Sequence, residues 1–240
     1  MSTEYDNIDV IGTTHEISRN ETDRKMNGYY HKQELASVIE LLEQMKLENF
    51  EQVIDLGCSI GTWYGDYRRL GFKHIIGIDI SEERLEIAKK RGYDETHCCN
   101  AYKLPFENDS QNYIISNDVL VHVIQDSDKS KIFDEIFRIL KKNGIFIFNV
   151  ANANGFGKKT DTTVGYCRYN TIKTISDLIN NSGLKIEFIL PSYYTYPRIG
   201  AHPYFVSLST SIIFPFIDYI LKSKNNTSLS KVIYFAVRKK

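Results

Sequence analysis

Short apolar runs alternate with amphipathic stretches along most of this chain of 240 residues. The runs at 53–56, 75–78, 113–116 and 145–148 are each suited in length and composition to one buried strand. Between strands, apolar side chains recur at helical spacing, as they do in 132–140, and this predicts helices with one buried face. Strands that alternate with helices form a parallel sheet covered on both sides. The pattern therefore predicts an α/β domain.

The start of the chain is predicted to lie outside this regular core. Residues 1–27 are polar and show no periodicity, which predicts a loose arm. From Gln33 to Leu47 the apolar residues fall on one stripe, which predicts a helix with one buried face. We therefore divide the chain into an N-terminal arm or cap, 1–33, and one domain, 34–240.

The region after the strand at 145–148 is less regular. Residues 151–170 are rich in Gly, Asn and Thr, and we expect them to form a structureless loop that binds substrate. A helix closed by Gly183 and a strand at 184–190 are predicted next, and the last apolar strand falls at 232–237. Residues 191–230 are thus an insertion before that last strand. The helix predicted at 132–140 should end at Asn143-Gly144.

Bulk composition narrows the function. The length fits one well-buried domain. Thirty basic and thirty acidic residues cancel, so no general positive charge attracts the phosphates of nucleic acid. The four cysteines (Cys58, Cys98, Cys99 and Cys167) lack metal-binding spacing, so we expect no metal site and no disulfide. The N-terminus lacks the segments of a signal peptide, which predicts a cytoplasmic protein.

The most informative segment is Val53–Gly61, an apolar strand that breaks into a turn containing Gly57 and Gly61. Glycine lets the backbone bend sharply and lie against a bound molecule. The helix that follows presents unpaired N–H groups to an anionic group. Asp79 ends the second strand, where a carboxylate can accept hydrogen bonds from both hydroxyls of a ribose. Together these residues predict a site for an adenosine-containing cofactor.

The spacing Gly57-x-x-x-Gly61 differs from the Gly-x-Gly-x-x-Gly of dinucleotide sites, which disfavours a nicotinamide oxidoreductase. It resembles motif I of the class I S-adenosyl-L-methionine (SAM)-dependent methyltransferases, and Asp79 resembles their ribose-binding acid. Segments 99–106, 113–123 and 138–148 resemble further parts of this family, in consecutive order. The chain is therefore identified as a member of the family, of the type that methylates small molecules.

The resemblance implies a Rossmann-like, seven-stranded, mostly parallel sheet with helices on both faces and an antiparallel last strand. It implies SAM as the cofactor and methyl transfer to an oxygen or nitrogen of a small metabolite: a sugar nucleotide, a phenolic or polyketide natural product, or a quinone precursor. The turn 117–120 lacks the Pro-Pro-aromatic segment of relatives that methylate flipped bases, which also disfavours nucleic acid. The cofactor residues that the resemblance implies are Asp55, Gly57, Cys58, Gly61, Asp79, Ile80, Asn100, Ala101 and Asn117.

The chain departs from the family at two positions. Ser59 stands where the family often has glycine, so the turn is more restricted here. Asn100 stands where an aspartate often caps the adenine amino group, and an amide oxygen can still accept that hydrogen bond but carries no charge. We therefore expect weaker cofactor binding rather than none.

Methyl transfer needs a general base only if the acceptor arrives protonated. His122 is the candidate base because its unperturbed pKa suits proton transfer near neutrality; a structural role is the alternative. Asn117 and Asp118 are expected to support the methionine end of SAM, through the Asn117 carbonyl, rather than to act as acids or bases. Insertions such as 191–230 build the substrate pocket in the family. The expected acceptor-site residues are Tyr30, Tyr166, Arg168, Tyr169, Tyr194 and His202.

The apolar run 204–221 contains Pro215 and Asp218 and is too short for a membrane span, so we expect no stable membrane insertion. We interpret it as a helix pair that lines the substrate pocket or forms a homodimer face. An interfacial anchor is the alternative, and it implies a lipid or isoprenoid acceptor at the membrane surface. A further alternative is a non-catalytic SAM-binding protein that serves as a partner or regulator.

Overall fold

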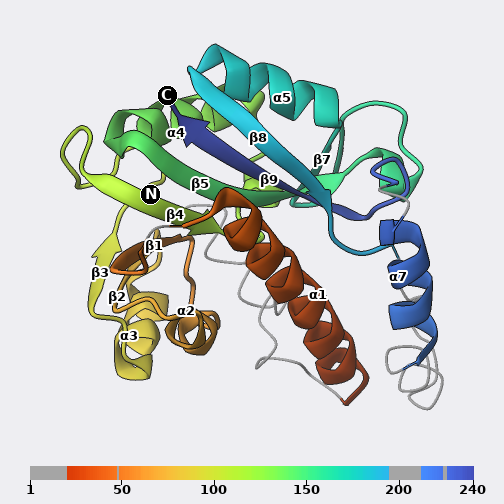
Figure 1. The fold of residues 1–240 in the computed structure, drawn as a ribbon, viewed down its shortest axis with the longest axis horizontal. Coiled ribbons are helices and arrows are strands. Elements are labelled where there is room, and N and C mark those ends of the chain that lie inside the picture. The colour runs from red at the N-terminus through yellow and green to blue at the C-terminus, as the bar shows by residue number, and fades with distance from the viewer. Residues whose placement is uncertain (1–20, 48, 195–211, 224–225) are drawn as a thin grey trace.

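The computed structural model describes residues 21–47, 49–194, 212–223 and 226–240 of the chain. These residues form one mixed sheet with helices on both faces (Figure 1). Neighbouring strands follow the order β3-β2-β1-β4-β5-β9-β8, and a short hairpin of β7 and β6 extends the end of β5. The strands are β1 (Gln52–Leu56), β2 (His74–Asp79), β3 (Glu95–Cys98), β4 (Gln111–Ser116), β5 (Leu140–Asn152), β6 (Thr162–Val164), β7 (Cys167–Asn170), β8 (Leu184–Pro191) and β9 (Val232–Lys239).

Strand direction confirms the expected fold class. The strands from β1 to β5 are parallel wherever they pair with one another. Strand β9 lies between β5 and β8 and runs antiparallel to both. The result is the mostly parallel, Rossmann-like sheet of seven strands with an antiparallel last strand, to which the β6–β7 hairpin is added.

Helices cover the sheet in two layers (Figure 1). One face carries α1 (Glu21–Met45), α2 (Tyr64–Leu70) and α3 (Glu82–Arg91), and the other carries α4 (Asp126–Ile139) and α5 (Ile172–Asn181). Helix α7 (Phe214–Ser223) stands beside α1, away from the sheet. Two short 3-10 helices, η2 (Leu120–His122) and η3 (Asn154–Phe156), follow β4 and β5.

A hydrophobic core lies on each face of the sheet, because successive side chains of a strand point to opposite faces. In β5, Ile145 and Ile147 pack toward α1, whereas Phe146 and Phe148 pack toward α4 and α5. Because both faces are covered, the central strands are continuously apolar rather than alternating with polar residues. The parallel register also brings the carboxyl ends of β1, β2, β3 and β4 to one edge of the sheet, where ligands bind in open α/β sheets.

Three local predictions were wrong. Helix α1 begins at Glu21, so residues 21–27 are helical rather than a loose arm, and the boundary between 33 and 34 falls inside this helix. Helix α4 ends at Ile139, before Asn143-Gly144, because β5 pairs with β4 from Leu140 onward. Much of 151–170 is structured rather than loose, because β6 and β7 pair across a turn and β7 pairs with β5.

Candidate active site

The loop between β1 and α2 depends on its two glycines. Gly57 has φ +80°, and a Cβ there would lie 2.1 Å from Cγ2 of Val119. Gly61 has φ +81°, and its Cβ would lie 2.7 Å from the ring of Tyr93. Both positions need a left-handed backbone and have no room for a side chain, so glycine is required at each.

Asp79 joins this loop to the end of β2. Its Oδ2 accepts a hydrogen bond from the N–H of Ser59 at 2.9 Å, and its Oδ1 accepts one from the N–H of Ser81 at 3.0 Å. The side chain is buried, at 8% exposure, rather than exposed at the strand end. Each carboxylate oxygen accepts more than one hydrogen bond, so both keep an acceptor position for a ligand hydroxyl.

The segments after β2 and β3 lie side by side. The N–H of Cys99 donates to the carbonyl of Asp79 at 3.0 Å. Ile80 is 46% exposed there, which suits contact with an apolar ring, and Ala101 is half-buried. Asn100 is exposed, and its Oδ1 already accepts a hydrogen bond from the N–H of Tyr102 at 3.2 Å. The adenine-binding role of these residues stays a prediction.

Two of the expected cofactor residues point into the core instead. Asp55 is 2% exposed and accepts hydrogen bonds from the hydroxyls of Tyr93, at 2.5 Å, and Tyr67, at 3.2 Å. Burial raises the pKa of Asp55 to about 7. Cys58 is also buried, which raises the pKa of its thiol, and its Sγ lies against Gly77. These side chains support the loop from behind.

A buried polar network continues beneath the end of β4. The Asn117 Oδ1 accepts a hydrogen bond from Tyr234 Oη at 2.8 Å, and its Nδ2 lies 3.4 Å from Tyr67 Oη. Asn149 donates from Nδ2 to Asp118 Oδ1 at 2.8 Å and accepts from the Asp118 N–H at 2.7 Å. The Asn117 side chain is thus committed to the core, which leaves only its backbone carbonyl for the expected contact with the methionine end of SAM.

Asp118 and His122 follow β4 at the same edge of the sheet. Asp118 is exposed and has φ +58°, an uncommon conformation for a residue other than glycine. Loss of hydration around its carboxyl raises the pKa of Asp118. The hydrogen bond from Asn149 and the nearby His122 and His31 oppose this rise. His122 Nδ1 lies 3.2 Å from the Tyr166 carbonyl oxygen. That hydrogen bond requires a proton on Nδ1, so Nε2 is the accepting nitrogen of a neutral ring.

This chain resembles known methyltransferases in sequence and in fold. A family model described as a methyltransferase domain matches residues 54–148. Phosphoethanolamine N-methyltransferase 2 of Caenorhabditis elegans is 29% identical over 147 residues, which cover 55% of this chain and 32% of that protein. An uncharacterised protein of Methanocaldococcus jannaschii is 34% identical over 109 residues, which cover 45% of this chain and 40% of that protein. Residues 54–148 thus carry a methyltransferase domain of the class I SAM-dependent family.

A solved structure has the same fold. Magnesium protoporphyrin IX methyltransferase from Synechocystis PCC 6803, with bound SAM, has a TM-score of 0.61 and covers 100% of this chain and 92% of its own. At 14% identity this likeness shows the fold and not a shared acceptor. The chain spans less than half the length of the two curated relatives, at 32% and 40%, so their names do not fix its acceptor.

The β6–β7 hairpin carries three of the expected acceptor residues. Tyr166 lies at its turn and is 48% exposed. Arg168 forms ion pairs with Asp126, at 3.1 Å, and Asp161, at 3.7 Å, so its charge holds the hairpin to α4. The Tyr169 ring lies 4.8 Å from the ring of Phe156. Strand β7 contacts η2, which brings the hairpin and His122 together.

The remaining acceptor predictions fall around α1 and α7. Tyr30 is buried and stacks on Tyr193, with ring centroids 4.8 Å apart. Tyr194 is buried, and its N–H donates to Asp218 of α7 at 3.0 Å. Both rings are thus packing residues of the α1–α7 region in this structure. His202 lies outside the described residues, and its role stays a prediction.

Helix α1 brings two further polar residues, His31 and Glu34, to this region. His31 Nε2 lies 2.7 Å from Asp66 Oδ2, and its ring lies 4.6 Å from that of Trp63. Glu34 is 3% exposed. Its pKa is raised, mainly by burial and further by the charge of Asp118. Sequence reasoning missed Glu34, because the apolar stripe is the stronger pattern in this helix. A glutamate on the buried face of an amphipathic helix was the signal available.

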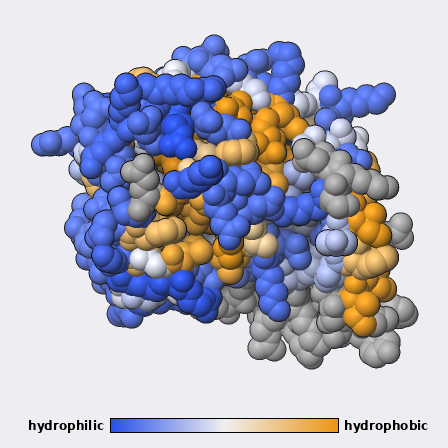
Figure 2. Space-filling model, in the orientation of Figure 1, coloured by the Kyte–Doolittle hydropathy of each residue, from blue (hydrophilic) through white to orange (hydrophobic). Residues whose placement is uncertain are grey.

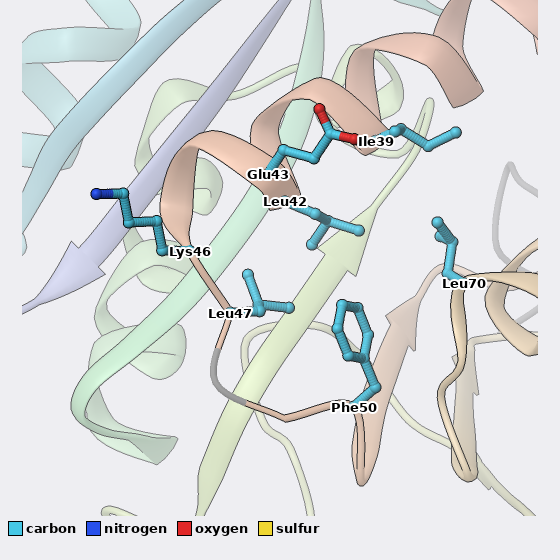
Figure 3. A pocket seen from close by; sticks show the side chains of 7 residues that line it. All are labelled: Ile39, Leu42, Glu43, Lys46, Leu47, Phe50 and Leu70. Carbon is cyan, nitrogen blue, oxygen red and sulfur yellow. The ribbon is translucent and has the colours of Figure 1, made fainter.

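A pocket of about 390 Å³ lies at the other end of the sheet, near the start of β1 (Figure 3). It contains no residue of the Gly57–Gly61 loop and neither Asp79 nor Asp118, so it is separate from the cofactor residues. The pocket is lined by Ile39, Leu42, Glu43, Lys46, Leu47, Phe50 and Leu70.

Among the described helices, none is long and apolar enough to cross a membrane.

Proposed function

We propose that this methyltransferase transfers the methyl group of SAM to an oxygen or nitrogen of a small metabolite and releases S-adenosylhomocysteine. One observation carries the proposal. Asp79 is fixed by the N–H groups of Ser59 and Ser81 where the loops after β1 and β2 meet, beside exposed Ile80. A carboxylate that can accept hydrogen bonds from a ribose and an apolar side chain that can contact an adenine therefore lie next to each other. Both adjoin a loop that requires glycine at positions 57 and 61.

The residues present fit SAM. Asp79 keeps acceptor positions for the ribose hydroxyls. The Asn117 backbone carbonyl suits the methionine ammonium, because the Asn117 side chain is held by Tyr234. Ile80 and Ala101 suit the faces of the adenine. When bound, SAM supplies a methyl group that is already activated.

The protein then has to position the acceptor, exclude water and accept a proton where the acceptor is protonated. The β6–β7 hairpin and α1 flank the turn after β4 and suit the first two tasks. His122 Nε2 suits the third, because the Tyr166 carbonyl favours the tautomer that leaves this nitrogen as acceptor.

Calorimetric titration with SAM, S-adenosylhomocysteine and NAD tests the cofactor. We expect the first two to bind and NAD not to bind. Asp79→Ala should abolish SAM binding, whereas Asp177→Ala, at an exposed ion pair of α5, should not change it. Mass spectrometry of a panel of amines, phenols, sugar nucleotides and tRNA then tests transfer. SAM binding without transfer to any of them would favour the non-catalytic alternative.

A lipid or isoprenoid acceptor is the second candidate, and α7 is the observation that favours it. Apolar side chains cover its outer surface (Figure 2), and Phe216 and Tyr219 are 65% and 74% exposed. Such a surface suits either a membrane interface or a second copy of the chain. Flotation with anionic vesicles separates the two, because only the membrane interface predicts that the protein floats with them.

A further inference from the structure

The side chain of Glu34 is buried, and its carboxylate has no partner within the part of the chain that the structure describes. Its side chain lies on α1 and is 3% exposed. Within the described residues it forms no hydrogen bond and no ion pair. A buried charge of this kind costs considerable free energy unless something compensates it. Residues retained at such a cost are candidates for binding a ligand.

Neighbouring residues fix the direction in which Glu34 points. One helical turn earlier, Tyr30 stacks on Tyr193, and one turn later the Ser37 hydroxyl donates to Ser192 at 3.0 Å. Glu34 lies on the same face of α1, because residues three or four apart share a face. That face is turned toward β8 and β9. Burial is the main cause that raises the pKa of the Tyr234 hydroxyl in β9. The charges of Glu34 and Asp118 raise this pKa further.

Asp118 supplies the second carboxylate. Its Oδ1 is bonded to Asn149, and the described residues give its Oδ2 no hydrogen bond. The side chain is exposed, so a ligand can reach it. Two carboxylates that act on each other repel unless a proton or a cation compensates them.

The protein's own cations near this edge have other partners. His31 contacts Asp66, and His122 contacts the Tyr166 carbonyl. Lys129 binds the Val123 carbonyl, and Arg168 pairs with Asp126 and Asp161. Among the described residues, no group of three or more His, Cys, Asp or Glu is arranged to hold a metal ion.

We propose that Glu34 and Asp118 form a subsite for the ammonium group of the acceptor, so that the methyl acceptor is an amine. The inference rests on the proposed function and narrows it to nitrogen. An ammonium fits because it offers three N–H donors and a positive charge to two carboxylates. The methionine ammonium of SAM has the same chemistry, and the test separates these two sources.

The proton balance of the reaction uses the same groups. An amine bound as R–NH3+ loses one proton to the Glu34 carboxylate, which takes the place of His122 as proton acceptor when the acceptor is an amine, and the nitrogen so gains a lone pair. One N–C bond then forms while the S–C bond breaks, which gives R–NH2+–CH3 and S-adenosylhomocysteine. The product is again a cation that faces Asp118, and the proton on Glu34 leaves to solvent.

The test titrates the full chain, saturated with S-adenosylhomocysteine, with phosphoethanolamine, tyramine and histamine. Tyrosol, which replaces the amine of tyramine by a hydroxyl, is the uncharged counterpart. Glu34→Gln and Asp118→Asn are compared with Glu43→Gln, an exposed position on the same helix. The affinities for SAM and for 5′-methylthioadenosine, which has no ammonium, are measured for every variant.

We expect at least one amine to bind more tightly than tyrosol, and Glu34→Gln to weaken that binding about tenfold or more. SAM affinity should be the same in Glu34→Gln, Glu43→Gln and the parent protein. A Glu34→Gln variant that loses affinity for SAM but not for 5′-methylthioadenosine would assign the carboxylates to the cofactor and overturn the proposal. So would the absence of amine binding in a protein that binds S-adenosylhomocysteine, although the proposed function would then stand. Failure to bind either cofactor form would instead contradict the proposed function itself.

Discussion

The N–H of Ser59 lies 2.9 Å from Oδ2 of Asp79, so the loop after β1 is bonded to the end of β2 in the protein alone. Ser81 completes the joint from the other side of the carboxylate. Asp79 therefore has a structural task in addition to its expected contact with ribose, and both tasks use the same two oxygen atoms.

Replacing Asp79 by Ala should lower stability as well as SAM affinity. The change leaves two backbone N–H groups without their charged acceptor, which costs roughly 1–3 kcal/mol. The fold should survive this loss, but its melting temperature should fall. Calorimetric titration and thermal melting measure the two effects. A variant that binds SAM normally would show that the ribose site lies elsewhere, and Asp177→Ala controls for a loss of surface charge.

Replacing Ser59 by Gly should leave the protein equally stable or make it more stable. Ser59 has φ +49°, and a left-handed backbone costs roughly 1–2 kcal/mol for residues with a Cβ. Urea unfolding measures the change, which the greater entropy of glycine in the unfolded chain partly offsets. Ser127→Gly, at an exposed position in α4, should only destabilise. If both variants lost the same stability, Ser59 would carry no strain.

Stability should fall as the pH rises from about 4 to 7, because of Asp55. The folded-state pKa of Asp55 is about 7, above the ordinary value of 3.8 for an aspartate, so the folded protein keeps a proton that the unfolded chain has lost. The free energy of unfolding should fall by about 1.4 kcal/mol per pH unit for one such proton. Urea unfolding across this range measures it, and Asp55→Asn should reduce the slope.

Groups with the opposite shift act in a lower pH window. The pKa values of Asp66, Asp94 and Asp161 are lowered in the fold, so their stabilisation is lost only as the pH falls below their unfolded values. They therefore do not mask the slope assigned to Asp55. Stability that rose steadily between about pH 4 and 7 would contradict that assignment.

The cofactor loop was predictable because its constraints are local. Gly57 and Gly61 stand in a turn between an apolar strand and a helix, and Asp79 ends the next apolar run. These demands of backbone conformation and strand ends are visible in neighbouring residues of the sequence. The same holds for Ser81, whose hydroxyl accepts a hydrogen bond from the N–H of Arg84 at the start of α3.

The polar network beneath the site depends on contacts that the sequence does not reveal. Asn149 and Tyr234 are register partners only because β9 enters the sheet beside β5. Glu34 comes near Asp118 only because α1 crosses the same edge of the sheet. The β6–β7 hairpin is not predictable from the sequence, because its strands are short and the Gly, Asn and Thr content of 151–170 is typical of a loop. Tertiary pairing decides each of these cases.

Replacing Glu34 by Gln should stabilise the protein without ligands at about pH 8 and have little effect at about pH 5. The raised pKa of Glu34 means that the protein pays the cost of a buried charge only at the higher pH. A gain of roughly 1 kcal/mol is expected from removal of the uncompensated charge. Thermal melting at both pH values measures it, with Glu43→Gln as the exposed control. A loss of stability at both values would show that Glu34 is a structural residue.

Replacing Arg168 by Met should loosen the β6–β7 hairpin without weakening SAM binding. The arginine pairs with Asp126 of α4 and with Asp161, and it is only partly exposed. Hydrogen exchange should therefore increase in 162–170, and His122 should lose its fixed contact with the Tyr166 carbonyl. A KM for the acceptor that rises more than kcat falls would show that the hairpin positions the acceptor. Lys173→Met, which removes an exposed pair with Asp177, should change neither measurement. Unchanged hydrogen exchange in Arg168→Met would mean that packing, such as the Tyr169–Phe156 contact, holds the hairpin without these ion pairs.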